Sequence, residues 1–113
     1  MLPKKHKITN RRIIPNILNN GKSISTPLFV IKYIYNKEKD SHFGIITSAK
    51  ISKKAVERNK ARRRIYEAIR HFLNEQGDTE KNIDAIFLAK KSCLEADYET
   101  ISKTISNNLS KIL

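Results

Sequence analysis

A chain of 113 residues has room for one domain built around a single hydrophobic core. Hydrophobic residues make up 39% of the chain and charged residues 30%, a balance that excludes a disordered or a fibrous protein. Lys and Arg total 23 against 11 Asp and Glu, giving a net charge of +12. We therefore expect a polyanionic partner, with nucleic acid ahead of an anionic membrane surface.

The first predicted element is a helix over residues 8–20. Isoleucine and leucine recur there at helical spacing, and Gly21 follows as an end signal. Pro15 is compatible with a first helical turn, so the helix is expected to be short or to start late. A further short strand over residues 22–25 is possible.

The next elements are two strands. Residues 27–35 are rich in β-branched and aromatic side chains, interrupted by Lys32, and predict a strand. A polar turn over residues 36–41 leads to a second strand over residues 42–50. Because the turn between them is short, the two strands are predicted to form an antiparallel hairpin.

The second half of the chain begins with the strongest predicted helix, over residues 52–76, with Ser52 as N-cap and Gly77 as its end. Residues 83–89 predict a buried strand, and residues 94–113 predict an amphipathic helix. The order helix–strand–strand–strand–helix–strand–helix predicts an α/β (α+β) two-layer sandwich. About three helices would pack on a small mixed four-stranded sheet.

The helix over residues 52–76 carries its cations in its first half. Eight Lys or Arg residues lie between positions 50 and 64, opposed by Glu57 alone. The apolar residues of its second half share one stripe: Ile65, Ile69, Phe72 and Leu73. At about 100° per residue, this stripe leads back to Arg58 and Arg62. Cations therefore stand where a core-facing helix needs apolar groups.

Two interpretations of this cationic segment are open. The helix can simply extend beyond its core into solvent, or its end can be a docking surface for RNA. The planar fork of arginine binds phosphate oxygens in a bidentate manner and stacks on bases. Cations at a helix N-terminus also oppose the helix dipole by about 0.3–1 kcal/mol each. The sequence keeps several cations at this end despite the unfavourable dipole interaction, which favours the docking surface.

No catalytic machinery is expected in the polypeptide. Its histidines and aspartates are scattered and lack motif-spaced partners: His6, His42, His71, Asp40, Asp78, Asp84 and Asp97. A protein nuclease with two metal ions needs clustered carboxylates, and no P-loop or dinucleotide motif is present. The lone Cys93 excludes an intramolecular disulfide and is expected to pack in the core. We therefore predict neither catalytic nor metal-binding residues.

The chain carries no targeting or membrane signal in its pattern. No stretch approaches the roughly 18 apolar residues that span a bilayer. The basic residues 1–9 are followed by polar and charged residues, unlike a secretory signal. We expect a cytoplasmic protein without a membrane partner, in which residues 1–113 form a single RNA-binding domain.

The segment over residues 52–70 resembles the signature of the bacterial ribonuclease P protein component family, approximately A-x-x-R-N-R-x-(K/R)-R-x-x-R-E. The matching positions are Ala55, Arg58, Asn59, Arg62, Arg63 and Glu67. Residues 44–50 resemble the glycine-led strand of that family, and residues 84–91 resemble its last strand. The first predicted helix follows the apolar spacing of its counterpart, so the resemblance extends over most of the chain.

The resemblance implies a left-handed β-α-β crossover, against the general preference for right-handed ones. It also implies the protein subunit of ribonuclease P, assembled with a catalytic RNA, with no cofactor bound by the protein alone. The RNA, with magnesium, hydrolyses the phosphodiester bond that frees the 5′ end of tRNA. The protein binds that RNA through the signature helix, one protein per RNA. It holds the single-stranded 5′ leader of precursor tRNA between the first helix and the sheet.

Several positions depart from the family pattern. Lys60 and Tyr66 stand where arginine is usual, and Lys60 keeps the charge without the bidentate fork. Ile14 and Leu18 replace aromatic residues of the first helix, and Lys32 replaces an aromatic residue of the first long strand. We expect Lys32 to reach leader phosphates in place of a stacking contact.

Three RNA-contacting surfaces are predicted. The catalytic RNA is expected to dock on the signature helix and the residues before it: Lys53, Lys54, Arg58, Asn59, Lys60, Arg62, Arg63 and Arg64. The leader is expected to contact the strands and the connection that follows them: Phe29, Lys32, Tyr33 and Lys50. The rings of Phe29 and Tyr33 are either stacking groups or core residues. The basic N-terminal segment is expected to steer RNA, with His6 beside the leader: Lys4, Lys5, Lys7, Arg11 and Arg12.

Other functions remain open at this point. A structural RNA-binding protein of the ribosomal type would share the charge and the sandwich without assisting cleavage. A DNA-binding regulator is disfavoured, because no short helix and turn precede the basic helix and no dimerisation zipper follows it. A protein-only nuclease lacks the clustered carboxylates that it would need.

Overall fold

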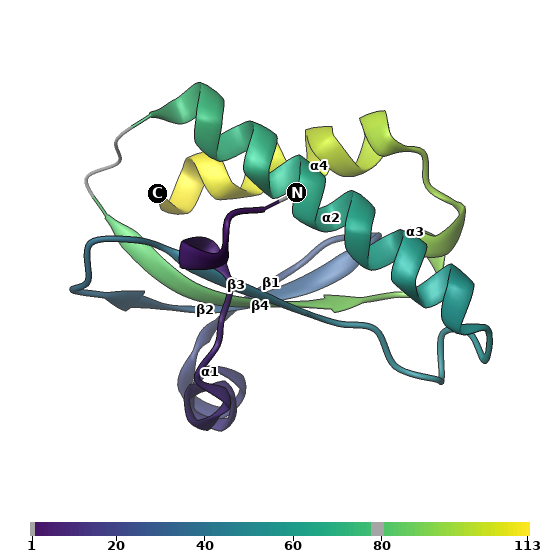
Figure 1. Ribbon diagram of the computed structural model, residues 1–113, viewed down its shortest axis with the longest axis horizontal. Helices are drawn as coiled ribbons and strands as arrows, with labels where there is room; N and C mark the ends of the chain where they lie inside the picture. The colour runs from purple at the N-terminus through teal and green to yellow at the C-terminus, as the bar shows by residue number, and fades with distance from the viewer. Residues whose placement is uncertain (1, 78–80) are drawn as a thin grey trace.

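A computed structural model of the chain describes residues 2–77 and 81–113, and its helices and strands form two layers with one extra helix (Figure 1). The sheet carries α2 and α4 on one face and α1 on the other. This arrangement confirms the predicted α/β sandwich. The elements are α1 (Ile14–Asn20), β1 (Lys22–Ser25), β2 (Phe29–Asn36), β3 (His42–Ile46), α2 (Ala55–Gln76), β4 (Asn82–Ala89), α3 (Ser92–Glu95) and α4 (Tyr98–Ile112).

The sheet has the order β1-β2-β4-β3, so the predicted hairpin of β2 and β3 is wrong. The strand β4 lies between them, antiparallel to β2 and parallel to β3. Residues 83–87 of β4 are all buried, which requires a central position with both edges paired and both faces covered. β3 is shorter and ends at the exposed Ile46, as suits an edge strand.

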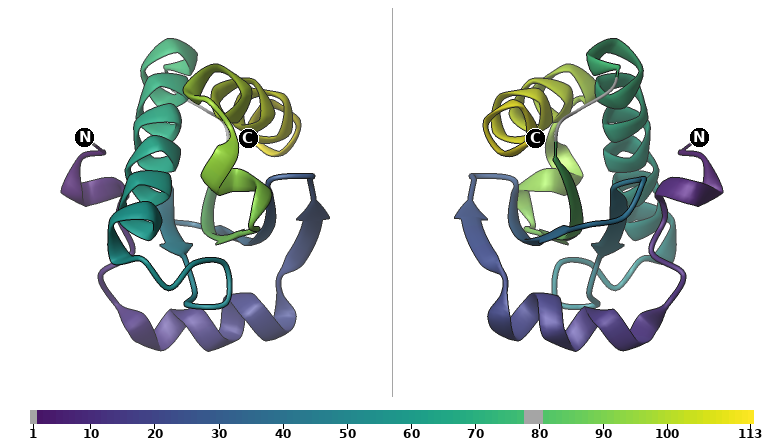
Figure 2. Two further views of the ribbon diagram at one scale, coloured as in Figure 1. Left: turned by 90° about the vertical axis from the view of Figure 1, so that its right-hand side faces the viewer. Right: turned by 90° about the vertical axis from the view of Figure 1, so that its left-hand side faces the viewer.

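The connection from β3 through α2 to the parallel β4 is a left-handed crossover. In Figure 1 both strands run from left to right below α2, and β3 lies nearer the viewer; Figure 2 confirms this depth order from the side. The handedness implied by the family resemblance is therefore present. It is the uncommon hand for such a unit.

The core lies between the sheet and the pair α2 and α4. Phe87 on β4 is fully buried, with its ring 5.1 Å from that of Phe29 and 6.3 Å from that of Phe43. From the helices, the predicted stripe of α2 is buried through Ile65, Ile69 and Phe72. The buried residues of α4 recur at the predicted spacing: Ile101, Ile105, Leu109 and Ile112. Cys93 is buried beside them, as expected.

The terminal helices are shorter than predicted. In place of one helix over residues 8–20, a 3₁₀ turn at Arg11–Ile13 precedes α1, and Pro15 occupies the first turn as expected. The predicted helix over residues 94–113 is divided into α3 and α4. Asp97 caps α4 by accepting a hydrogen bond from the backbone N–H of Thr100 at 2.8 Å. In the described parts of the chain, no helix is long and apolar enough to cross a bilayer.

The long helix α2 begins at Ala55, after the N-cap Lys54, so the prediction of Ser52 as N-cap is wrong by two residues. The Ser52 hydroxyl instead accepts from the backbone N–H of Lys54 at 3.1 Å and donates to Glu57 at 3.2 Å. At the other end, Gly77 stops the helix as predicted. Its φ of 69° is a conformation that favours glycine.

Gly21, between α1 and β1, tolerates no side chain. A Cβ at this position would lie 2.4 Å from the carbonyl oxygen of Ile17 and 2.9 Å from that of Tyr33. Both atoms are backbone, so neither can move without shifting α1 or β2. We expect Gly21→Ala to lower the free energy of unfolding by about 1–3 kcal/mol, the usual cost of overpacking.

Urea denaturation measures this effect on Gly21→Ala. Asn19→Ala, on the exposed side of α1, is the matched control and should change stability by less than about 0.5 kcal/mol. Equal midpoints for the two variants would contradict the close approach at Gly21.

Candidate nucleic-acid interface

The first turns of α2 hold two arginines in fixed positions. Arg58 donates to the carbonyl oxygen of Ser52 at 2.8 Å. Arg62 donates to the Thr47 hydroxyl at 2.7 Å and to the Asn59 side-chain oxygen at 3.0 Å. These bonds tie α2 to the connection that follows β3. Every acceptor is neutral, so both guanidinium groups keep their full charge for a partner.

We define the cationic face as the polar residues of the first turns of α2 and those just before it. Its members are Lys53, Lys54, Arg58, Asn59, Lys60, Arg62 and Arg63. Arg58 and Arg62 are half-buried, and the others are exposed. Among described residues, the closest carboxylate contact on this face joins Lys54 to Glu57 at 4.0 Å, and no ion pair involves the arginines or Lys60. Apart from this contact, the described residues leave the cations of the face without carboxylate partners.

Arg64, predicted to join this surface, points elsewhere. Its guanidinium donates to the carbonyl oxygen of Ala96 at 2.9 Å, in the connection between α3 and α4. That contact ties α2 to the C-terminal helices. The structure therefore separates Arg64 from the cationic face.

Glu67, the last signature position, does not neutralise the cationic face. Arg70 forms an ion pair with it and donates through Nε at 2.7 Å. The hydrogen bond from Arg70 lowers the pKa of Glu67 to about 2. The charge of Glu67 is thus already engaged within its own helix.

The four predicted leader contacts lie in different places. On β2, the alternating pattern sends Phe29 and Tyr33 into the core with Ile31, so neither ring is presented as a stacking group. Lys32 lies on the opposite face, where it donates to the carbonyl oxygen of Leu18 in α1 at 3.2 Å. Lys50 is exposed in the connection after β3. The structure therefore brings Lys32, but not the two rings, to the side that α1 covers.

The N-terminal segment runs beside β3 and α2 (Figure 2). Lys7 pairs with Phe43 at the free edge of β3, and the N–H of Ile8 donates to the carbonyl oxygen of Phe43 at 3.0 Å. From there, the Lys7 ammonium lies 5.1 Å from the centre of the Tyr66 ring. The sequence pattern identified Tyr66 only as a replacement for a family arginine and did not predict this contact. Lys4, Lys5, Arg11 and Arg12 are exposed along the same segment.

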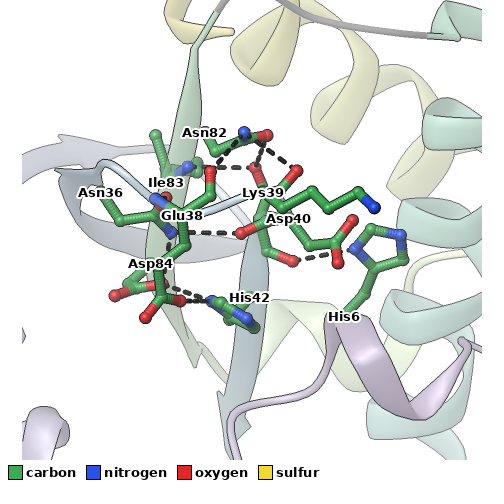
Figure 3. Close-up of polar contacts among 10 residues, drawn as sticks. His6, Asn36, Glu38, Lys39, Asp40, His42, Asn82, Ile83 and Asp84 are labelled. Carbon is green, nitrogen blue, oxygen red and sulfur yellow. Dashed lines mark hydrogen bonds and ion pairs between the residues drawn. The ribbon is translucent and has the colours of Figure 1, made fainter.

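A second polar group lies at the start of β3, at the other end of the strand from the connection that Arg62 contacts (Figure 3). His42 Nδ1 is 2.8 Å from Asp84 and 3.5 Å from Glu38, and Asn36 donates to Asp84 at 2.8 Å. His6 meets the carbonyl oxygen of Ser41 at 2.9 Å, which places it on this side and not beside α1.

The expectation that the histidines and carboxylates stay apart is wrong for this group. Glu38, His42 and Asp84 have ligand atoms within 4.8 Å of one another and form, in the described ranges, the one such set that could hold a metal ion. The members come from a turn and two strands, so no regular spacing in the sequence predicts the group. As they stand, their mutual hydrogen bonds join β3 to β4. Asp78, another of the scattered carboxylates, lies outside the described residues.

Comparison with known proteins agrees with the resemblance noted in the signature helix. A family model described as Ribonuclease P matches residues 2–113. The ribonuclease P protein component of Clostridium botulinum (strain 657 / Type Ba4) is 32% identical over 108 residues, covering 96% of this chain and 95% of that protein. That of Mycoplasma capricolum subsp. capricolum is 36% identical over 109 residues, covering 91% and 97%.

A solved structure extends the agreement to the fold. The RNase P protein from Thermotoga maritima matches with a TM-score of 0.78 at 28% identity, covering 95% of this chain and 97% of that chain. The agreement extends over nearly the full length of both chains. The chain therefore belongs to the ribonuclease P protein family.

Proposed function

We propose that this ribonuclease P protein subunit docks the catalytic RNA on its cationic face and contacts the 5′ leader of precursor tRNA on the side of the sheet near α1. The observation that carries the proposal is the set of anchored arginines on α2 with no described carboxylate against them. A charge of +12 in so small a domain is costly without a polyanion.

The geometry of α2 supports phosphate binding in two ways. Arg58 and Arg62 are already held in place by hydrogen bonds, so RNA binding costs little side-chain conformational entropy. No side chain caps the N-terminus of α2, which leaves its leading N–H groups available to a phosphate. Both features favour a folded RNA backbone as the partner.

The leader contact rests on the other face of the sheet. Strand pairing puts Val30, Leu88 and Ile46 side by side on the face that carries Lys32. All three are at least partly exposed. We call Val30, Leu88 and Ile46 the apolar floor. Unstacked bases pack well on apolar side chains of this kind, while Lys32 and Lys50 supply positive charge for the phosphates. We infer that the leader crosses this floor beside α1.

In this proposal the polypeptide positions RNA and leaves bond cleavage to its partner. Hydrolysis falls to the catalytic RNA with magnesium, and one protein serves one RNA. A ribosomal-type structural role is not favoured, since the family is that of ribonuclease P. The test is reconstitution with a bacterial ribonuclease P RNA and precursor tRNA at low magnesium. We expect faster cleavage at the mature 5′ end, and an unchanged rate would overturn the proposal.

Salt titration of RNA binding provides a second measurement. If about six phosphates are neutralised, the logarithm of the association constant should fall against the logarithm of salt concentration with a slope of roughly −4 to −5. Lys60→Gln removes one exposed cation and should reduce the slope by roughly 0.7–0.9. A slope near zero would reject an electrostatic docking face.

A further inference from the structure

We propose that Tyr66 and Lys7 form a pocket for one unpaired nucleotide of the catalytic RNA, whose base stacks on the Tyr66 ring. The inference rests on the proposed function and names a contact within it. It departs from the signature pattern, in which this position carries arginine instead of an aromatic ring.

The pocket lies between α2 and the N-terminal segment. Side chains spaced by three and four residues share one face of a helix, which brings Asn59, Arg63 and Tyr66 into line. Together with their neighbours they enclose a hollow of about 410 Å³, a volume within the range of small-molecule sites. Its lining consists of Lys7, Asn59, Arg62, Arg63, Tyr66 and Glu67.

Both walls of the hollow are held in place by the fold. Lys7 is fixed because its backbone pairs with Phe43 at the edge of β3. The Tyr66 ring is held on its other side because it is partly buried and packs against the hydrophobic core. Burial raises the pKa of Tyr66, although the nearby charge of Arg62 opposes the rise, so the phenol stays neutral. A neutral, anchored ring is a suitable stacking platform.

The charge around the ring selects the ligand. The Lys7 ammonium lies over the Tyr66 ring, 5.1 Å from its centre, so this face of the ring is covered by a flexible side chain and not by the core. An entering base would displace the ammonium toward the phosphate of its nucleotide. Arg62 and Arg63, without a described carboxylate partner, stand beside it for the phosphate. An aromatic ring with flanking cations is the common arrangement for binding unstacked nucleotides. A base within a duplex could not enter such a hollow.

The position of the pocket favours the catalytic RNA over the leader. Tyr66 lies on the same helix as the cationic face, beside the N-terminal segment. The apolar floor with Lys32 lies across the sheet, on the side of α1 (Figure 2). An RNA docked on the first turns of α2 therefore reaches Tyr66 without crossing the sheet.

The test compares Tyr66→Leu with Tyr66→Phe in binding to ribonuclease P RNA. Loss of a stacked base should weaken binding of the Leu variant by about 5- to 150-fold with the salt slope unchanged. Tyr66→Phe keeps the ring and should bind within about twofold of the parent. Arg63→Gln, in contrast, should reduce the salt slope. Circular dichroism checks that each variant is folded.

Three outcomes would overturn the pocket while leaving the proposed function intact. Tyr66→Leu could bind as tightly as the parent, Tyr66→Phe could lose as much as Tyr66→Leu, or the loss could appear only with a single-stranded leader oligonucleotide. In the unmodified complex, ultraviolet crosslinking should join Tyr66 to a nucleotide of the catalytic RNA, and a crosslink map without it would also reject the pocket. Failure of the parent protein to bind or stimulate the RNA would instead reject the proposed function.

Discussion

Replacing Arg58 and Arg62 together by glutamate is expected to abolish stimulation of leader cleavage while the protein remains folded. Hydrogen bonds to charged groups contribute about 1.5–3 kcal/mol each, so losing two such contacts weakens RNA binding by roughly 100-fold or more. The reversed charges would also repel the phosphates that the arginines attract. Cleavage of precursor tRNA by the reconstituted enzyme at low magnesium measures the effect.

A matched control separates the docking face from net charge. Lys103→Glu with Lys111→Glu makes the same change in charge on the exposed side of α4. This pair should retain most of the stimulation, because α4 lies away from the first turns of α2. Full activity of the Arg58 and Arg62 double variant, or equal loss in both pairs, would remove the cationic face from the mechanism.

Phe87→Ala is expected to cost about 3–5 kcal/mol of stability, the usual penalty for removing a buried aromatic ring. Phe87 is fully buried on the central strand, between the rings of Phe29 and Phe43. Domains of this kind are stable by about 5–15 kcal/mol, so the variant should lie close to unfolding at ordinary temperatures. Urea or thermal denaturation followed by circular dichroism gives the change.

Two further variants calibrate this loss. Phe87→Leu keeps most of the apolar volume and should be destabilised less than Phe87→Ala. Val56→Ala alters a side chain that is 78% exposed and should leave stability within about 0.5 kcal/mol of the parent. A midpoint for Phe87→Ala close to that of Val56→Ala would contradict the central place of this ring in the core.

Local patterns in the sequence were sufficient to identify most of the elements and the cationic helix. The stripe of Ile65, Ile69 and Phe72 is buried as predicted, and the cations before it lie at the exposed end of α2. Period and charge are properties of neighbouring residues, so they can be read without knowing the tertiary structure.

Pairing over long sequence distances was not predictable in the same way. Residues 83–89 were recognised as a strand, but nothing local reveals that β4 separates β2 from β3. The Glu38, His42 and Asp84 group depends on that insertion, because Asp84 reaches His42 only through the pairing of β4 with β3. The alternative left open at Phe29 and Tyr33 could have been decided from the sequence, since alternation along β2 puts both residues on the face opposite Lys32.

The central position of β4 has a consequence for biosynthesis. The strand that completes the sheet is made after both of its neighbours. Synthesis proceeds from the N-terminus, and contacts between distant residues form slowly. A nascent chain that still lacks residues 82–89 already carries the basic segment, but it has no finished sheet to hold that segment in shape. Assembly with ribonuclease P RNA on a finished sheet must therefore wait until β4 has been made.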